Sequence, residues 1–112
     1  MENCLFCKIV KGEIPSKRVY EDEAVFAFED IKPQAPVHIV IAPKKHFANV
    51  SEVADETVLG RIQAAAAKIA ASRPECANGY RIVNNCGPDG GQTVFHVHYH
   101  LLGGRQFTWP PG

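Results

Sequence analysis

Histidine side chains at alternating positions are the residues of this sequence best suited to chemistry. The segment 95–102 reads Phe-His-Val-His-Tyr-His-Leu-Leu and places His96, His98 and His100 two residues apart. The valine, tyrosine and leucine that follow them favour strands. Because alternate side chains of a strand point to the same face, this spacing predicts a row of three imidazoles on one side of a sheet.

Two other interpretations of the histidine row are a metal site and a set of structural histidines. Neighbouring members would lie about 7 Å apart along a strand and the outer two about 13 Å apart, given a rise of ~3.3–3.4 Å per residue. A zinc–nitrogen bond is only about 2.0–2.1 Å long, so two neighbours could share an ion with ligands from elsewhere, but all three could not. Three histidines in register beside a glycine-rich loop favour a functional site over a structural role.

The glycine-rich polar loop, residues 85–93, leads directly into the histidine row. It contains Asn85, Gly91, Gln92 and Thr93. Glycine lets backbone N–H groups approach an anion closely, and amide and hydroxyl side chains add further donors. The loop is not a P-loop, since no Gly-Lys-Ser/Thr follows, and by itself it is also compatible with an ordinary hairpin connection. Next to three histidines it predicts a cradle for a phosphate or another oxyanion.

A Cys-x-x-Cys pair, Cys4 and Cys7, lies at the start of the sequence. A redox role requires a thioredoxin-like strand and helix, which the neighbouring residues do not predict. A zinc site requires two further ligands, for which His38, His46 and a member of the histidine row are available. Two small buried apolar side chains are the remaining interpretation. The residues alone leave all three open.

Composition narrows the class of protein. Twelve basic and twelve acidic residues balance over 112 positions, which argues against a nucleic-acid-binding or membrane-binding surface. No apolar run approaches the ~18–20 residues of a membrane span, and the first residues lack the basic-then-apolar pattern of a signal peptide. We therefore expect one domain, residues 1–112, in the cytoplasm, where the four cysteines are thiols or metal ligands.

Apolar periodicity predicts the elements that position these residues. Strands are expected at residues 18–20, 24–28, 37–41, 80–84 and 95–102. A single long helix, residues 51–72, is expected to cover one face of the sheet, and a short helical turn at residues 4–10 precedes the strands. The tail, residues 103–112, contains the only tryptophan, Trp109, and is expected at an interface or at the rim of a binding pocket.

The sequence resembles the histidine triad (HIT) superfamily and, within it, the Hint branch. Residues 96–102 match the superfamily signature, in which three histidines alternate with apolar residues. Further segments resemble the Hint branch: residues 6–15, 30–38, 43–46, 85–91 and 104–112. The resemblance implies an α+β fold with a five-stranded antiparallel sheet, one long helix and a short N-terminal helix. It also implies a homodimer in which the sheet continues across both subunits and the tail contributes to the interface.

The resemblance also implies roles for individual residues. The implied catalytic set is His98 as nucleophile, His100 at the phosphate, and His96 and His38. The implied nucleotide contacts are Phe6, Ile9, Ile14, Asp30, Ile31, Asn85, Gly91, Gln92, Thr93, His98, His100 and Trp109. Asp30 is expected to bind the ribose, and the apolar residues to surround the base. A structural zinc site, as in bacterial relatives, is implied at Cys4, Cys7, His46 and His96.

The activity implied by the resemblance is that of a purine nucleoside phosphoramidase, which forms a nucleotidyl-histidine intermediate and needs no metal for catalysis. The neutral imidazole of His98 would attack the α-phosphorus while a backbone carbonyl of the same strand fixes its other ring nitrogen. Two rival functions remain: hydrolysis of dinucleoside polyphosphates, as in the Fhit branch, and a zinc-containing nucleotide-binding module that acts through protein partners. Asn84 and Cys86, which flank Asn85, depart from the Hint pattern and bear on substrate preference.

Overall fold

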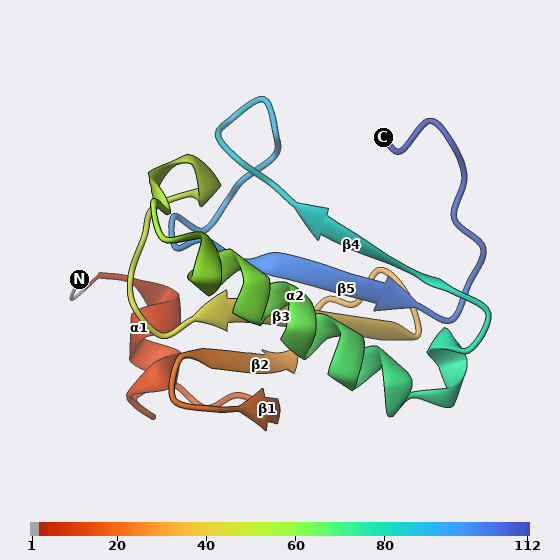
Figure 1. Ribbon diagram of the computed structural model, residues 1–112, viewed down its shortest axis with the longest axis horizontal. Helices are drawn as coiled ribbons and strands as arrows, with labels where there is room; N and C mark the ends of the chain where they lie inside the picture. The colour runs from red at the N-terminus through yellow and green to blue at the C-terminus, as the bar shows by residue number, and fades with distance from the viewer. Residues whose placement is uncertain (1–2) are drawn as a thin grey trace.

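A five-stranded antiparallel sheet is the framework of the structure, a computed structural model that describes residues 3–112 (Figure 1). The strands are β1 (Arg18–Glu21), β2 (Val25–Glu29), β3 (Val37–Pro43), β4 (Tyr80–Asn84) and β5 (Tyr99–Gly103). They lie in the order β1-β2-β3-β5-β4, and every neighbouring pair is antiparallel. The predicted α+β fold with this sheet is confirmed.

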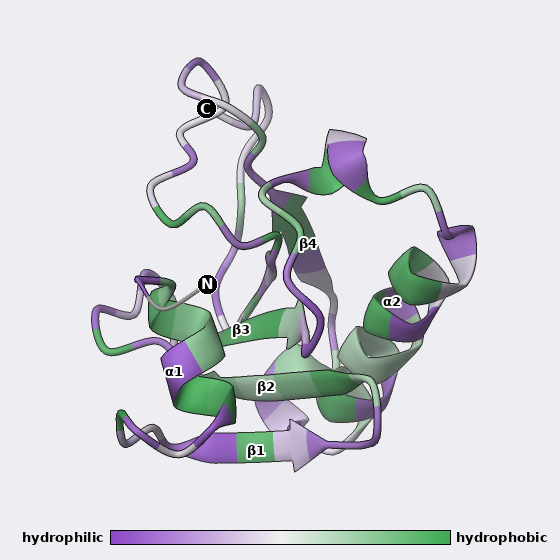
Figure 2. Cartoon of the chain, turned by 90° about the vertical axis from the view of Figure 1, so that its left-hand side faces the viewer, coloured by the Kyte–Doolittle hydropathy of each residue, from purple (hydrophilic) through white to green (hydrophobic). Residues whose placement is uncertain are grey.

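Two α-helices pack on opposite faces of the sheet, as the view in Figure 2 shows. Helix α1 (Leu5–Val10) is short and helix α2 (Glu56–Ala71) is long. Two 3-10 turns, η1 (Val50–Glu52) and η2 (Pro74–Cys76), precede and follow α2. Among the described residues, no helix is both long and apolar enough to cross a membrane.

The long helix begins at Glu56, later than the predicted start at residue 51. The side chain of Asp55 accepts a hydrogen bond from the backbone N–H of Thr57 and so pairs a donor that the first turn leaves free. Upstream, the side chain of Asn49 caps the separate turn η1 in the same way. Each capping side chain therefore starts its own helix, and the two do not merge.

The sheet separates two apolar cores. The α2 face is formed by Val25, Ala27, Val37, Ile39, Ile41 and Leu101, which pack with Ile62, Ala65, Ala66 and Ile69 of the helix. The α1 face is formed by Phe26, Phe28, Val40 and Ala42, which pack with Phe6 and Ile9. Alternate residues of each strand thus enter different cores, as strand geometry requires. Each fully buried isoleucine or phenylalanine contributes about 1.5–3 kcal/mol relative to an exposed one.

The histidine strand is shorter than the sequence predicted, because β5 begins only at Tyr99. The carbonyl group of His96 accepts a hydrogen bond from the ring of His98, and the carbonyl group of His98 accepts one from the side-chain amide of Asn84 in β4. The alternation nevertheless extends through this segment. Val97 is buried in the α2 core, whereas Phe6 of α1 contacts the rings of both His96 and His98. The predicted common face of the three histidines is confirmed, although the strand bounds were wrong.

Candidate active site

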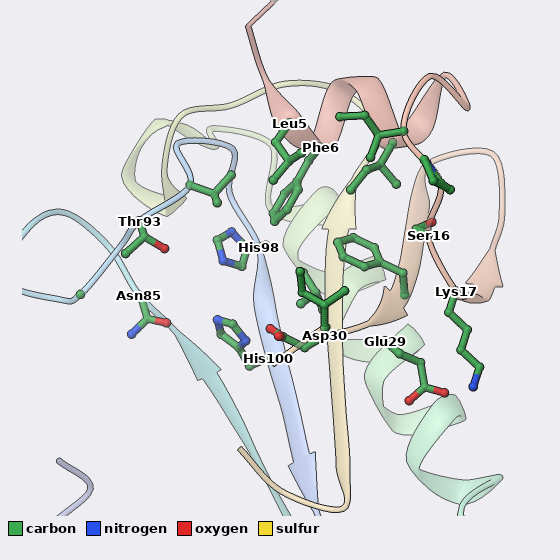
Figure 3. A pocket seen from close by; sticks show the side chains of 18 residues that line it. Leu5, Phe6, Ser16, Lys17, Glu29, Asp30, Asn85, Thr93, His98 and His100 are labelled. Atoms are coloured by element: carbon green, nitrogen blue, oxygen red, sulfur yellow. The ribbon is translucent and has the colours of Figure 1, made fainter. Parts of the chain in front are cut away.

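A cavity of about 580 Å³ opens on the α1 face of the sheet, in front of His98 and His100 (Figure 3). Of the residues expected to contact nucleotide, the apolar ones that line it are Phe6, Ile9, Ile14 and Ile31. The polar and glycine residues that line it are Asp30, Asn85, Gly91, Thr93, His98 and His100. A volume of about 300–1,000 Å³ with one apolar wall and a few convergent polar groups is typical of a small-molecule site.

The apolar wall also contains residues that the sequence prediction missed, among them Phe28 and Val40. Strand register explains their position: Phe28 pairs with Val40, which in turn pairs with His100, so the three form one row across β2, β3 and β5. The ring of Phe6 meets that of Phe28 edge to face, with centroids 5.4 Å apart. Strand alternation could have suggested Phe28, whereas pairing between distant strands had to be known to place it beside the histidines.

The ring of His98 is held in a defined orientation. Its Nδ1 lies 2.8 Å from the main-chain oxygen of His96. A carbonyl oxygen only accepts hydrogen bonds, so Nδ1 carries the proton and Nε2 keeps its lone pair. Burial lowers the pKa of His98, against the opposing influence of this hydrogen bond and of Asp30. The imidazole is therefore neutral at pH 7, and the expected backbone acceptor is confirmed.

A chain of hydrogen bonds fixes the tautomer of His100 as well. The backbone N–H of Gln34 donates to Nδ1 of His38 at 3.0 Å, so this nitrogen is unprotonated. His38 therefore carries its proton on Nε2, which lies 2.8 Å from Nδ1 of His100. His100 accepts that bond and keeps its own proton on Nε2, which makes it a hydrogen-bond donor toward the cavity. His38 itself is buried behind His100 and does not line the cavity.

The imidazoles of the site are uncharged near neutral pH. The pKa of His100 is lowered to about 4, chiefly by burial and then by the neighbouring His98 and His38. Burial also lowers the pKa of His38, although Asp30, whose Oδ2 lies 3.5 Å from Nε2 of His38, acts in the opposite direction. Such a site combines a neutral nucleophile with a neutral hydrogen-bond donor, and this pair suits attack on an anionic phosphorus centre.

Asp30, His38 and His100 lie close enough together to resemble a metal site. Their hydrogen bonds argue against that role. His38 accepts a backbone N–H at Nδ1, so binding a metal through Nε2 would require its ring to lose both protons. We therefore interpret this group as a hydrogen-bonded relay.

A second cluster, Cys4, Cys7, His46 and His96, has the composition and spacing of a zinc site. Its four ligand atoms all lie within 4.8 Å of one another. Nδ1 of His96 is 3.2 Å from Sγ of Cys4, and Nδ1 of His46 is 3.6 Å from Sγ of Cys7. Tetrahedral zinc with its usual bond lengths separates sulfur and nitrogen ligands by about 3.6 Å. The other ring nitrogen of His96 lies 2.8 Å from the Pro43 carbonyl, a second contact typical of a metal-bound histidine.

His96 is fully buried in this cluster and does not line the cavity. We therefore do not count His96 among the residues that contact substrate. It acts on the site through its main-chain carbonyl, which orients the ring of His98. The strand prediction could not separate these roles because it treated the three histidines as equivalent.

The structure does not bring Gln92 or Trp109 into the cavity. The amide of Gln92 donates to the carbonyls of Ala48 and Val94 and accepts from the N–H of Gly87, so this buried side chain shapes the loop. Trp109, in the tail, is 82% exposed. Sequence reasoning also missed Lys17, which lines the cavity but belongs to no recognisable motif.

Comparisons with known proteins agree with this fold and site. Residues 11–107 match the HIT domain family. The structure resembles that of a HIT family hydrolase from Legionella pneumophila, with a TM-score of 0.94 and 53% identity, covering 98% of this chain and 100% of that one. The chain is 52% identical to a 14 kDa zinc-binding protein of Zea mays, covering 96% of this chain and 87% of the relative. It is 47% identical to the adenylylsulfatase HINT1 of Arabidopsis thaliana, covering 96% and 76%.

The sheet, the cavity and the alternating histidines define a histidine triad protein. Together with the match over residues 11–107, they show that this chain belongs to the HIT family. The activities named among these relatives are hydrolytic, which supports hydrolytic chemistry in general.

Proposed function

We propose that this protein hydrolyses purine nucleoside phosphoramidates at the α-phosphate through a covalent nucleotidyl-His98 intermediate. Adenosine 5'-phosphoramidate and adducts of AMP with lysine are examples of such substrates. The observation that carries the proposal is the fixed tautomer of His98, which leaves the Nε2 lone pair at the cavity. A HIT family hydrolase and an adenylylsulfatase among the relatives support it further.

The cavity offers a place for each part of a nucleotide. The apolar wall around Phe6, Ile9 and Ile14 suits a purine base, and the carboxylate of Asp30 suits the ribose hydroxyls. The phosphate would lie between His98, His100 and the glycine-rich loop, where Thr93 supplies a hydroxyl donor. In Figure 3, Thr93 and Asn85 lie on the side of the histidines away from Ser16 and Lys17, so base and phosphate would occupy opposite ends of the site.

The proposed reaction has two displacements at phosphorus. In the first, Nε2 of His98 forms a bond to the α-phosphorus while the phosphorus–nitrogen bond breaks, and the amine leaves with a proton from the medium. The carbonyl of His96 stabilises the positive charge that develops on the ring of His98. His100 donates its Nε2–H to a phosphate oxygen. In the second, water attacks phosphorus, the bond to His98 breaks, and the nucleoside monophosphate is released.

No step in this scheme uses a metal ion. We propose that Cys4, Cys7, His46 and His96 hold a structural Zn²⁺, which supplies cross-links between α1 and the segment before β5. The relative named a zinc-binding protein supports this assignment. Metal analysis of wild-type protein against Cys4→Ala is the test: the wild type should contain one zinc ion and the variant much less, and equal contents would refute the site.

We also propose that the protein forms a homodimer through β4. Among residues 3–112 this strand is at the edge of the sheet and pairs only with β5, so its outer backbone groups can extend the sheet into a second copy. The exposed Trp109 would then contribute to the partner's site. Sedimentation should give twice the chain mass; a monomer at micromolar concentration would contradict the proposal.

The decisive experiment compares wild type with His98→Ala on a panel of substrates. Wild type should release AMP from adenosine 5'-phosphoramidate, and the variant should lose turnover by a factor of about 10⁴ or more, because it lacks the imidazole that forms the covalent intermediate. Retention of AMP binding by the variant is the control for folding. Substantial turnover by the variant would refute the nucleotidyl-His98 intermediate.

Hydrolysis of adenylyl sulfate is a second candidate, which the adenylylsulfatase among the relatives favours. It shares the attack on the α-phosphorus and differs only in the leaving group. The panel therefore includes adenylyl sulfate and a diadenosine polyphosphate, and the highest kcat/KM identifies the preferred leaving group. Negligible turnover of every substrate, with retained nucleotide binding and a stable protein partner, would favour the binding-module alternative.

A further inference from the structure

The Cys4–Cys7–His46–His96 cluster is linked to the nucleotide cavity through His96. Its ring Nδ1 lies 3.2 Å from Sγ of Cys4 and 3.6 Å from Sγ of Cys7. Its main-chain oxygen accepts the 2.8 Å hydrogen bond from the ring of His98. Because His96 is fully buried in a packed interior, a change in where its ring is held must be taken up by its backbone. The cluster and the tautomer of the nucleophile therefore depend on one residue.

Helix α1 is a second link between the two sites. Cys4 caps this helix by accepting a hydrogen bond from the N–H of Cys7, and Cys7 lies within it. Phe6 and Ile9 of the same helix line the cavity, and the ring centroid of Phe6 is 4.9 Å from that of His98. A helix of six residues is not stable alone in water, so tertiary contacts must hold it in place. Two residues of the cluster belong to those contacts.

A surface groove of about 800 Å³ gives solvent access to the cluster. Cys4 and His46 form part of its wall, whereas Leu5, Thr93 and Val94 line both the groove and the nucleotide cavity. The other two members of the cluster are buried. An ion can therefore reach the cluster from solvent while the sheet stays intact, at a point directly beside the cavity.

We propose that metal occupancy of this cluster controls the nucleotide cavity. A bound Zn²⁺ would fix α1 and His96, and metal loss would loosen both the cavity wall at Phe6 and the orientation of His98. The identity of the nucleotide in this proposal rests on the proposed function. The structural part, in which metal orders residues 5–10 and 96–98, does not depend on that function. Because coupling between two sites is reciprocal, nucleotide must also strengthen metal binding by the same factor.

Amide hydrogen exchange tests the structural part without any activity measurement. Wild-type protein is compared with one equivalent of Zn²⁺ and after treatment with a chelator. Metal removal should speed exchange at residues 5–10 and 96–98 at least about fivefold, while the middle of α2, on the other face of the sheet, stays unchanged. Equal exchange in both forms, or no Zn²⁺ binding, would overturn the proposal.

Calorimetry with AMP tests the coupling itself. Metal removal should weaken AMP binding at least about fivefold, and saturating AMP should strengthen Zn²⁺ binding by the same factor. Equal AMP affinity with and without zinc would overturn the coupling. If AMP binds neither form, the proposed function fails separately, and hydrogen exchange still decides whether metal orders the cavity wall.

Variants distinguish the metal effect from loss of a side chain. His46→Ala removes a cluster member that does not line the nucleotide cavity, so with Zn²⁺ present it should resemble metal-free wild type in AMP affinity. Cys76→Ala is the matched control, since it removes a buried thiol outside the cluster and should respond to zinc as wild type does. An AMP affinity for zinc-treated His46→Ala equal to that of zinc-loaded wild type would contradict the proposal. If His46→Ala does not fold, chelator-treated wild type supplies the same comparison.

Discussion

The pH dependence of the free energy of unfolding tests whether His100 is neutral in the folded protein. Burial, together with the neighbouring rings of His98 and His38, lowers its pKa to about 4, although Asp30 acts in the opposite direction. In the unfolded chain a histidine has a pKa of about 6.5. Between these values the unfolded chain binds a proton that the folded protein excludes. The free energy of unfolding should therefore fall as the pH decreases from 6.5 toward 4.

The size of this effect follows from the two pKa values. Between pH 7 and pH 5, His100 alone should lower the free energy of unfolding by roughly 2 kcal/mol, because each pH unit in the interval contributes about 1.4 kcal/mol. Burial also lowers the pKa of His38, His96 and His98, so the whole protein should lose more. In His100→Asn the titrating group is gone but a hydrogen-bond acceptor for His38 remains. This variant should lose about 2 kcal/mol less than wild type over the same pH range.

Urea denaturation at pH 7 and pH 5 measures how much unfolding free energy the wild type and His100→Asn each lose. A chelator in every sample keeps the cysteine–histidine cluster metal-free at both pH values, and a fixed protein concentration removes any contribution from association. Equal m-values for the two proteins are the control that the same surface unfolds. If His100→Asn loses as much stability between pH 7 and pH 5 as wild type, the assignment of a partly buried, neutral His100 is wrong.

Three further substitutions test the fold and the site. Ile62→Ala should lower the free energy of unfolding by about 2–5 kcal/mol in urea, since Ile62 is fully buried under the sheet; a loss below 1 kcal/mol would contradict that packing. Asn84→Ala should lower the free energy of unfolding by about 1 kcal/mol and reduce kcat, because the amide of Asn84 donates to the carbonyl of His98 at 2.9 Å. An unchanged kcat would show that this bond does not position the nucleophile. Phe6→Ala should weaken AMP binding about tenfold in calorimetry, and equal affinity would place the base elsewhere.

The alternation of residues 95–102 was sufficient to predict that three imidazoles share one face. It remained correct even though β5 starts at Tyr99, because the segment before the strand continues the same alternation. The strand that contains His38 and the apolar stripe of the long helix were predictable for the same reason. In each element, the spacing of the apolar residues decides which side chains enter which core. The start of the long helix was predicted less accurately: the helix was expected from residue 51, whereas Asp55 caps it at Glu56 and Asn49 caps the separate turn η1.

What the periodicity of the sequence determined by itself, therefore, is which residues share a face and which types are available for chemistry. The resemblance to the HIT superfamily implied separate roles for the three histidines, and only the tertiary structure showed the contacts that underlie those roles. It placed His96 with two cysteines 89 or more positions away in the chain, gave His98 a carbonyl acceptor, and paired His100 with His38. These roles depend on strand order and on the packing of α1, which bring distant residues within hydrogen-bonding distance. Local periodicity carries no information about such contacts, because it records only the direction in which each side chain points.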